Sequence, residues 1–260
     1  MTCTSVSLDA APRAAGPAAL SLEFPLPPGA APPLAAEPRA YLSLRAEGDM
    51  RYRADAANPN RDRFFRALGL WPERVLGLEL VHSRSVYFPL EEEAPAGGAD
   101  GMLLRDPGSA ASVTVADCMP IWLLDRESGA FGVLHSGWKG TGILEAAVRL
   151  LGERFGSAPA SVSVILGPAV GACCYAVPEE RAALFAAEFG PETVIREGGS
   201  PRLDLRAANL AIAARLGLGA LLSVEDCSSC RPELGSYRRE GSEAFTRMVA
   251  LAAYPPATGG

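Results

Sequence analysis

The chain has 260 residues, of which 48% are hydrophobic and 21% are charged, a composition typical of a folded globular protein. A chain of this length buries about 70% of the surface that it exposes when extended, so it needs no disulfide framework to hold a core. The formal net charge of −6 argues against a protein that binds nucleic acid through the phosphate backbone, and we expect no nucleic-acid partner.

The first 40 residues are rich in alanine and proline, and the prolines within residues 24–33 exclude a regular helix there. We expect residues 1–40 to form an extension over the surface, followed by a catalytic domain at 41–254 and a short tail at 255–260. The extension has no apolar run typical of a signal peptide, and no stretch of the chain reaches the ~18 apolar residues of a membrane helix. We therefore expect a cytoplasmic protein with no membrane partner.

Helices and strands alternate along residues 41–254 without a fixed repeat. Helical spacing of apolar residues occurs at 61–70, 140–155, 178–189 and 205–216, the last opened by Asp204 as N-cap. Runs typical of strands occur at 75–81, 101–105, 112–115, 119–124, 130–134, 161–166, 220–225 and 245–252. Residues 91–100 are acidic and glycine-rich, as in a surface loop. The pattern predicts one α/β domain.

Three residues of types that bind zinc lie where predicted strands begin or end. His82 follows one strand, Cys118 precedes another, and His135 follows a third. Their separations match no zinc-finger pattern, so contact among them requires the strands to pair. Two imidazoles and a thiolate would leave one coordination position for water or substrate, as in a catalytic zinc site. The alternative is that the three residues are unrelated, with Cys118 packed as a small core hydrophobe.

The sequence around these residues favours a reactive site. His135 opens the sequence His-Ser-Gly-Trp-Lys-Gly, a tight polar turn that could hold an anion near Lys139. Asp117 could accept a hydrogen bond from a ligand imidazole, or could be a turn residue that bonds its own backbone.

The remaining cysteines carry weaker signals. Cys227-Ser-Ser-Cys230 is a single Cys-x-x-Cys without a second pair, and the adjacent Cys173 and Cys174 do not easily share a metal. We expect no metal or redox role for either pair, and we expect reduced thiols throughout the chain.

Several motifs together carry a family resemblance. They are Val81-His-Ser-Arg84, Ala116-Asp-Cys-Met-Pro120, His135-Ser-Gly-Trp-Lys-Gly140 and Leu166-Gly-Pro168, then Asp204, Asn209, Cys227, Ser236-Tyr-Arg-Arg239 and Arg247-Met248. In order and approximate spacing they resemble the motifs of the laccase-domain family, also called the polyphenol oxidase or peptidoglycan-editing-factor family. The likeness extends over residues 41–252.

The resemblance implies a layered sandwich of mixed β-sheets flanked by helices, with zinc held by His82, Cys118 and His135. It also implies phosphorolysis of adenosine, guanosine, inosine and methylthioadenosine, with adenosine deamination in some members. Other members are linked to the editing of peptidoglycan precursors or to phenol oxidation. In this chain Lys139 stands where the family more often has arginine, and Leu234-Gly235 stands where it has an aromatic residue.

We therefore predict a zinc-dependent purine nucleoside phosphorylase whose partners are the nucleoside and phosphate. The predicted catalytic residues are Cys118, His135 and Asp117, and the candidate phosphate-binding residues are Arg61, Arg84 and Lys139. One alternative is a hydrolase in which a histidine activates Cys118 to attack a peptidoglycan precursor. A copper phenol oxidase is disfavoured, because two histidines are too few for a multicopper cluster.

Overall fold

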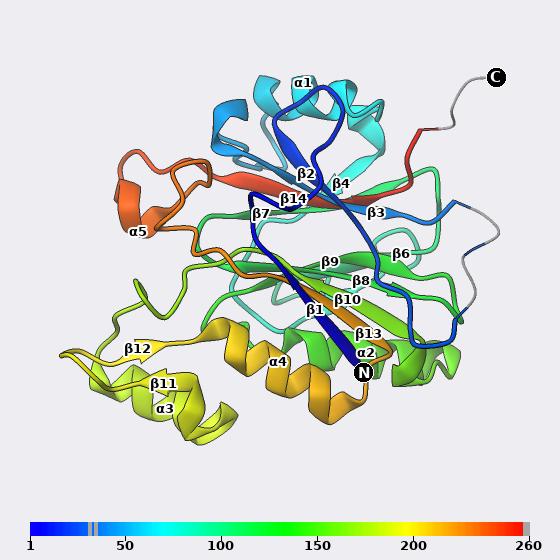
Figure 1. Cartoon of the computed structure of the whole chain (residues 1–260). Coiled ribbons are helices and arrows are strands. Elements are labelled where there is room, and N and C mark those ends of the chain that lie inside the picture. Colours follow the sequence, from blue (N-terminus) through cyan, green and yellow to red (C-terminus); the bar gives the residue numbers. More distant parts are fainter. Residues whose placement is uncertain (31–32, 34–35, 257–260) are drawn as a thin grey trace.

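The computed structural model describes residues 1–30, 33 and 36–256. Two β-sheets pack face to face, and helices cover the outer face of each (Figure 1). The larger sheet has the order β1 (Thr2–Val6), β13 (Ala220–Val224), β10 (Val162–Leu166), β8 (Met119–Asp125), β9 (Phe131–Ser136), β6 (Gly101–Leu104) and β5 (Val86–Tyr87). The smaller sheet has the order β2 (Ala19–Glu23), β3 (Arg39–Ser43), β14 (Met248–Ala253), β7 (Ala110–Val115) and β4 (Val75–Gly77).

The helices lie outside the two sheets. They are α1 (Pro59–Ala67), α2 (Ile143–Phe155), α3 (Glu179–Phe189), α4 (Leu205–Leu216) and the short α5 (Tyr237–Glu240). Figure 1 places α1 over the smaller sheet and α2 and α4 beneath the larger one, while α3 lies beside the small hairpin of β11 (Val194–Ile195) and β12 (Arg202–Leu203). No helix in the described part of the chain is long and apolar enough to cross a membrane.

Strand β8 explains why the larger sheet is apolar on both faces. Its side chains alternate, so that Ile121 and Leu123 pack with α2 and α4, whereas Trp122 and Leu124 pack between the two sheets. The fully buried Trp122 donates its Nε1–H to the carbonyl oxygen of Leu251 in β14, over 3.0 Å. This bond satisfies the polar atom of the ring and links the two sheets.

The predicted fold class is confirmed, since mixed sheets are flanked by helices. The four predicted helices match α1 to α4 to within three residues at each end. Asp204 caps α4 by accepting the N–H of Ala207 at 2.9 Å. Glycines end the longer helices in the expected way, since Gly156 and Gly217 follow α2 and α4 in the left-handed conformation.

The prediction that residues 1–40 form an extension outside the fold is wrong. Strand β1 pairs in parallel with β13, and β2 pairs antiparallel with β3. Leu20 and Leu22 of β2 are fully buried. Their two-residue alternation is a strand signal that the alanine- and proline-rich composition obscured. Residues 24–30 do lack regular structure, as expected.

The strand predicted at 75–81 is also shorter than expected. Strand β4 ends at Gly77, where its parallel pairing with β7 ends. Beyond it the chain turns, and His82 adopts a left-handed conformation with φ of 61°. His82 therefore belongs to an irregular loop rather than to a strand end.

Candidate functional site

The three predicted metal ligands lie together. The candidate donor atoms of His82, Cys118 and His135 all lie within 4.8 Å of one another, and the two imidazole centroids are 5.0 Å apart. Strand pairing explains this for two of them, because β8 and β9 are antiparallel and Met119 faces Ser136. Cys118 at the start of β8 therefore lies across from the end of β9, and the loop after β4 brings His82.

Asp100 positions both histidines, and the sequence did not reveal this role. Its fully buried carboxylate has Oδ1 3.0 Å from Nδ1 of His135, and the same oxygen accepts the backbone N–H of His82 at 2.9 Å. The other oxygen accepts the N–H and the hydroxyl of Ser83 at 2.6 and 2.8 Å. Because Nδ1 of His135 is engaged, Nε2 is the atom left for a metal.

The composition of residues 91–100 predicts only an acidic surface loop that ends at Asp100. The signal that could have found it is its place directly before the buried strand β6, which pairs with β9 and thus with the strand of His135. An acid at the start of an apolar strand is a candidate for a buried partner.

Backbone strain is concentrated at this site. Within the described residues, His82 and Asp117 are the two non-glycine residues with positive φ, at 61° and 81°. Residues held in this region mark sites where the surrounding structure imposes the conformation. The hydrogen bonds from the backbone N–H groups of His82 and Ser83 to Asp100 impose this conformation on His82.

Gly137 permits the close approach of Cys118. A Cβ at position 137 would lie 2.8 Å from the Cys118 sulfur and 3.7 Å from the His82 ring. The glycine in His135-Ser-Gly-Trp therefore leaves room for the group of donors.

The charges of Cys118 and His135 stabilise each other. Burial alone would raise the pKa of the Cys118 thiol, but the charge of His135 and hydrogen bonds with both imidazoles lower that pKa to about 6. Burial alone would lower the pKa of His135, but Cys118 and Asp100 raise it to about 10. Without a metal, the group therefore holds a thiolate beside an imidazolium, and a bound metal cation would replace the proton on His135.

His82, Cys118 and His135 line a cavity of about 690 Å³. Its cationic lining consists of Arg51, Arg53, Arg181, Arg238 and Arg247, and its aromatic lining consists of Tyr52, Trp138, Tyr175, Tyr237 and Phe245. Tyr237 and Phe245 form an edge-to-face pair with centroids 5.1 Å apart. Phe245 thus provides a second aromatic ring beside Tyr237. Leu234 and Gly235, which precede Ser236 and Tyr237 in the chain, provide none. A cavity with this lining suits a ligand that combines an anionic group with a flat ring.

Two of these arginines lie near Tyr175. Arg181 lies over the Trp138 ring at 4.6 Å and Arg238 over the Tyr175 ring at 5.3 Å. Burial mainly raises the pKa of Tyr175 to about 12, with the Cys118 charge adding to the rise and both arginines opposing it. Arg238 donates an Nη1–H to the Ala176 carbonyl oxygen at 3.2 Å, but neither arginine forms a salt bridge with an acid of the described residues, so both charges remain available to a ligand.

The arginines and the lysine predicted to bind phosphate do not line the cavity. Arg61 is buried, and its guanidinium donates to the Met50 carbonyl oxygen and the Ser112 hydroxyl. Its assignment to phosphate is therefore wrong, because these groups and two flanking rings occupy the guanidinium. Arg84 pairs with Glu188. Lys139 lies 5.5 Å from the centroid of the Trp138 ring.

Asp117 lines the cavity but does not contact an imidazole. Its two carboxylate oxygens accept the Ser228 hydroxyl and the backbone N–H of Arg238, each at 2.6 Å. The predicted role as an acceptor for a ligand histidine is wrong, because Asp100 occupies that place. Asp117 instead joins the start of β8 to the loops that carry Ser228 and Arg238.

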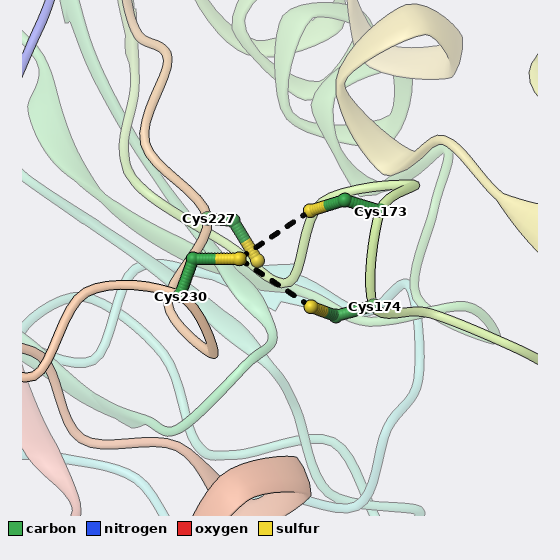
Figure 2. Close-up of side chains that lie close together, drawn as sticks. All are labelled: Cys173, Cys174, Cys227 and Cys230. Carbon is green, nitrogen blue, oxygen red and sulfur yellow. Dashed lines mark hydrogen bonds between the residues drawn. The ribbon is translucent and has the colours of Figure 1, made fainter.

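A second group of metal-binding residue types appears where the sequence suggested none. Cys173, Cys174, Cys227 and Cys230 bring their sulfurs within 4.8 Å of one another (Figure 2). The expectation that the Cys-x-x-Cys has no second pair is wrong, because the fold supplies that pair from a loop 53 residues earlier.

The comparisons with known proteins agree with the motifs. The sequence profile of the family described as multi-copper polyphenol oxidoreductase laccase matches residues 37–254. The chain belongs to this laccase family. The resemblance carried by the motifs around His82, Cys118 and His135 is thereby confirmed.

Several relatives of this chain have names that state a reaction. A purine nucleoside phosphorylase of Corynebacterium glutamicum is 32% identical over 194 residues, which cover 72% of this chain and 78% of the relative. An adenosine deaminase from an unknown prokaryotic organism is 34% identical over 147 residues, which cover 54% of this chain and 56% of the relative. The crystal structure of YlmD from Geobacillus stearothermophilus has a TM-score of 0.75 at 26% identity, covering 86% of this chain and 94% of the other. The relatives of this chain therefore include enzymes named for reactions on purine nucleosides.

Proposed function

We propose that this chain is a zinc-dependent purine nucleoside phosphorylase. The observation that carries the proposal is the group formed by His82, Cys118 and His135 in the wall of a cavity lined with arginines and aromatic rings. Arginines suit phosphate, aromatic rings suit a purine, and two imidazoles with a thiolate suit zinc. The names of the relatives support the same reaction class.

The donor set and its surroundings fit a zinc ion. Histidine nitrogen and cysteine thiolate are the ligands that zinc prefers, and a carboxylate on the far nitrogen of a ligand histidine is its usual support. Asp100 provides that support for His135. When bound, zinc would supply a Lewis acid with one coordination position free for an oxygen of the substrate, phosphate or water.

Arg181 and Arg238 are the residues that we assign to phosphate. In phosphorolysis the bond between the sugar C1′ and the purine nitrogen breaks while a phosphate oxygen bonds to C1′, so phosphate must be held close to the sugar. Both arginines line the cavity near Tyr175, and a guanidinium can hold two phosphate oxygens at once. The edge-to-face pair of Tyr237 and Phe245 provides an apolar surface for the purine.

Tyr175 can donate a hydrogen bond within the cavity. The departing purine takes up a proton, and the two histidines of the chain already belong to the metal group. Because burial raises the pKa of the Tyr175 hydroxyl to about 12, that hydroxyl keeps its proton at neutral pH. We assign Tyr175 to a hydrogen bond with phosphate or base, and proton delivery to the purine to solvent.

The deciding experiment incubates the purified full chain with adenosine, guanosine, inosine or methylthioadenosine, each with and without phosphate. Phosphorolysis releases the free base and a sugar phosphate only when phosphate is present. Adenosine deamination instead gives inosine without phosphate. If no nucleoside yields either product after reconstitution with zinc, the proposal fails.

A second candidate is a cysteine-type hydrolase acting on a peptidoglycan precursor. The pairing of Cys118 with His135, which lowers the pKa of the thiol to about 6, is the observation that favours it. A hydrolase of this type would be active without metal and inactivated by alkylation of Cys118, whereas the phosphorylase would lose activity on chelation. Phenol oxidation by a multicopper cluster has no support beyond the family description, because the chain contains two histidines.

A further inference from the structure

Two neighbouring strands bring four cysteines together away from the cavity. Strands β10 and β13 are parallel neighbours, with Leu166 beside Ser223 in register. The loops that follow their carboxyl ends therefore begin side by side, and they stay paired through a bridge between Ala169 and Cys227. The first loop carries Cys173 and Cys174, and the second carries Cys227 and Cys230.

The sulfurs of the four cysteines point toward one another (Figure 2). The Cys230 sulfur lies 3.7 Å from that of Cys173 and 3.5 Å from that of Cys174, and every pair lies within 4.8 Å. In a tetrahedral zinc site with Zn–S bonds of about 2.3 Å, the sulfurs lie about 3.8 Å apart. The four thiols thus already have nearly the spacing of such a tetrahedron.

The backbone around Cys227 favours a thiolate. The N–H of Gly171 donates to the Cys227 sulfur at 3.1 Å. Burial alone would raise the pKa of this thiol, but that bond and the backbone N–H groups of Ser229 and Cys230 lower it. A Cβ on Gly171 would lie 3.2 Å from the Cβ of Cys227 on the other loop, so the glycine lets the two loops approach.

We propose that Cys173, Cys174, Cys227 and Cys230 bind one zinc ion as a closed tetrathiolate site, separate from His82, Cys118 and His135. On binding, four thiols give up their protons to solvent and form four Zn–S bonds, with no change in oxidation state. No coordination position remains open, so the ion is structural. A polynuclear iron–sulfur cluster fits less well, because it spreads its cysteines over several iron atoms.

The site has a structural consequence for the cavity. The loop of Cys173 and Cys174 also carries Val170 and Tyr175, which line the cavity. The loop of Cys227 and Cys230 carries Ser228, whose hydroxyl donates to Asp117. A zinc ion joining the two loops fixes both cavity walls relative to the strands. The exposed Cys173 and Cys230 give the ion a route from solvent.

The test measures zinc per chain by mass spectrometry in the full protein, reduced and reconstituted with zinc. The His82→Ala substitution removes one ligand from the group of His82, Cys118 and His135. Zinc that the variant binds tightly is therefore attributed to the four cysteines. We expect His82→Ala to keep about one tightly bound zinc and His82→Ala with Cys230→Ser to lose it. Cys3→Ser, which removes an exposed cysteine outside the group, is the matched control and should change nothing.

Cobalt provides a second readout. Co²⁺ bound by the His82→Ala variant should give the intense sulfur-to-metal charge-transfer absorption of a tetrathiolate, and Cys173→Ser should reduce it while circular dichroism shows an unchanged fold. The proposal is overturned if folded His82→Ala binds neither metal with its thiols reduced. It is equally overturned if peptide mapping of protein purified without air and without added reductant, and alkylated directly, finds the four cysteines as disulfides. Because these readouts need no nucleoside, they stand apart from the test of phosphorolysis.

Discussion

Asp100 and His135 are joined twice, once between side chains and once between backbones. Oδ1 of Asp100 lies 3.0 Å from Nδ1 of His135, and the His135 N–H donates to the Asp100 carbonyl oxygen at 2.7 Å. The same carboxylate accepts the N–H groups of His82 and Ser83. One buried acid therefore orients the His135 imidazole and holds the backbone of His82, which makes it the positioning residue of the metal group.

Replacing this acid tests that relationship. Asp100→Asn replaces one carboxylate oxygen by an –NH₂ group, which cannot accept the hydrogen bonds that this oxygen accepted. Either His135 or the backbone of the His82 turn therefore loses its acceptor. We expect metal affinity to fall about 10- to 100-fold, as for other partners of ligand histidines. Competition with a chromogenic chelator measures the loss. The matched control is Asp106→Asn, in a surface turn where Asp106 accepts from Ser109 and Gly108. Equal affinity in Asp100→Asn and wild type would refute the positioning role.

Gly137→Ala tests the close packing of the donors. The added Cβ would lie 2.8 Å from the Cys118 sulfur, so the sulfur or the turn must move. We expect weaker metal binding and a destabilisation of about 1–3 kcal/mol, as for overpacking elsewhere. Thermal unfolding with and without zinc measures both effects. Gly97→Ala is the control, because no atom of the described residues lies within 4 Å of a Cβ there.

Cys118 should react as a thiolate when the metal is removed. Because its pKa is lowered to about 6, we expect alkylation of the Cys118 peptide to stay near its maximum from pH 8 to about pH 6.5 and to fall below pH 6. His135→Gln should raise the pKa and slow alkylation at pH 7. Zinc should protect the thiol in the wild type. An alkylation profile with a midpoint near the ordinary thiol pKa would contradict the proposed ion pair.

The free energy of unfolding, in contrast, should change little with pH because of the ion pair between Cys118 and His135. The lowered pKa of Cys118 adds stability as pH rises from about 6 toward its unfolded value of 9.0, and loses it as pH falls through 6. The raised pKa of His135 adds stability below its unfolded value of 6.5 and loses it as pH rises toward about 10. The two contributions have opposite slopes between about pH 6.5 and 9 and largely cancel, since the proton only moves from sulfur to nitrogen. Alkylation is therefore the sensitive measurement.

Local patterns in the sequence were sufficient for some of this structure. Helix α4 was predictable because its N-cap Asp204 and its closing Gly217 lie next to its apolar spacing. The nearness of Cys118 and His135 was predictable in principle, because they flank two strands joined by a short turn. Chemistry that depends on residues close in the chain is readable from the chain.

Features that depend on distant pairing were not readable. Asp100 acquires its role only because β6 pairs with β9. The four-cysteine group forms only because β10 pairs with β13, which neither Cys-x-x-Cys nor adjacent cysteines reveal. Among many arginines, the sequence could not tell a buried one such as Arg61 from one lining the cavity such as Arg181.

Arg61→Met separates the two classes of arginine. The change removes the donors to Met50 and Ser112. The buried Met50 carbonyl oxygen loses this hydrogen bond, whereas the Ser112 hydroxyl keeps its bond to the Leu76 carbonyl oxygen. We expect a loss of about 1–3 kcal/mol in the free energy of unfolding, since buried polar atoms without partners are costly. The KM for phosphate should not change below the unfolding temperature. A raised KM with unchanged stability would restore Arg61 as a phosphate ligand.

Arg181 and Arg238 should behave in the opposite way. Both are cavity residues whose charges are not neutralised by an acid of the described chain, so removing either leaves the core intact and weakens the hold on phosphate. We expect Arg181→Ala and Arg238→Ala to raise the KM for phosphate about tenfold or more, in line with the 1.5–3 kcal/mol or so of a hydrogen bond to a charged group. Arg149→Ala is the matched control, because Arg149 is exposed and forms its ion pair with Glu153 on the same helix, α2. Arg181→Lys should recover only part of the loss, since lysine keeps the charge but not the paired donors. If both alanine variants keep the wild-type KM for phosphate and instead raise that for the nucleoside, these arginines bind the base or the sugar, and the assignment of phosphate to this side of the cavity is refuted.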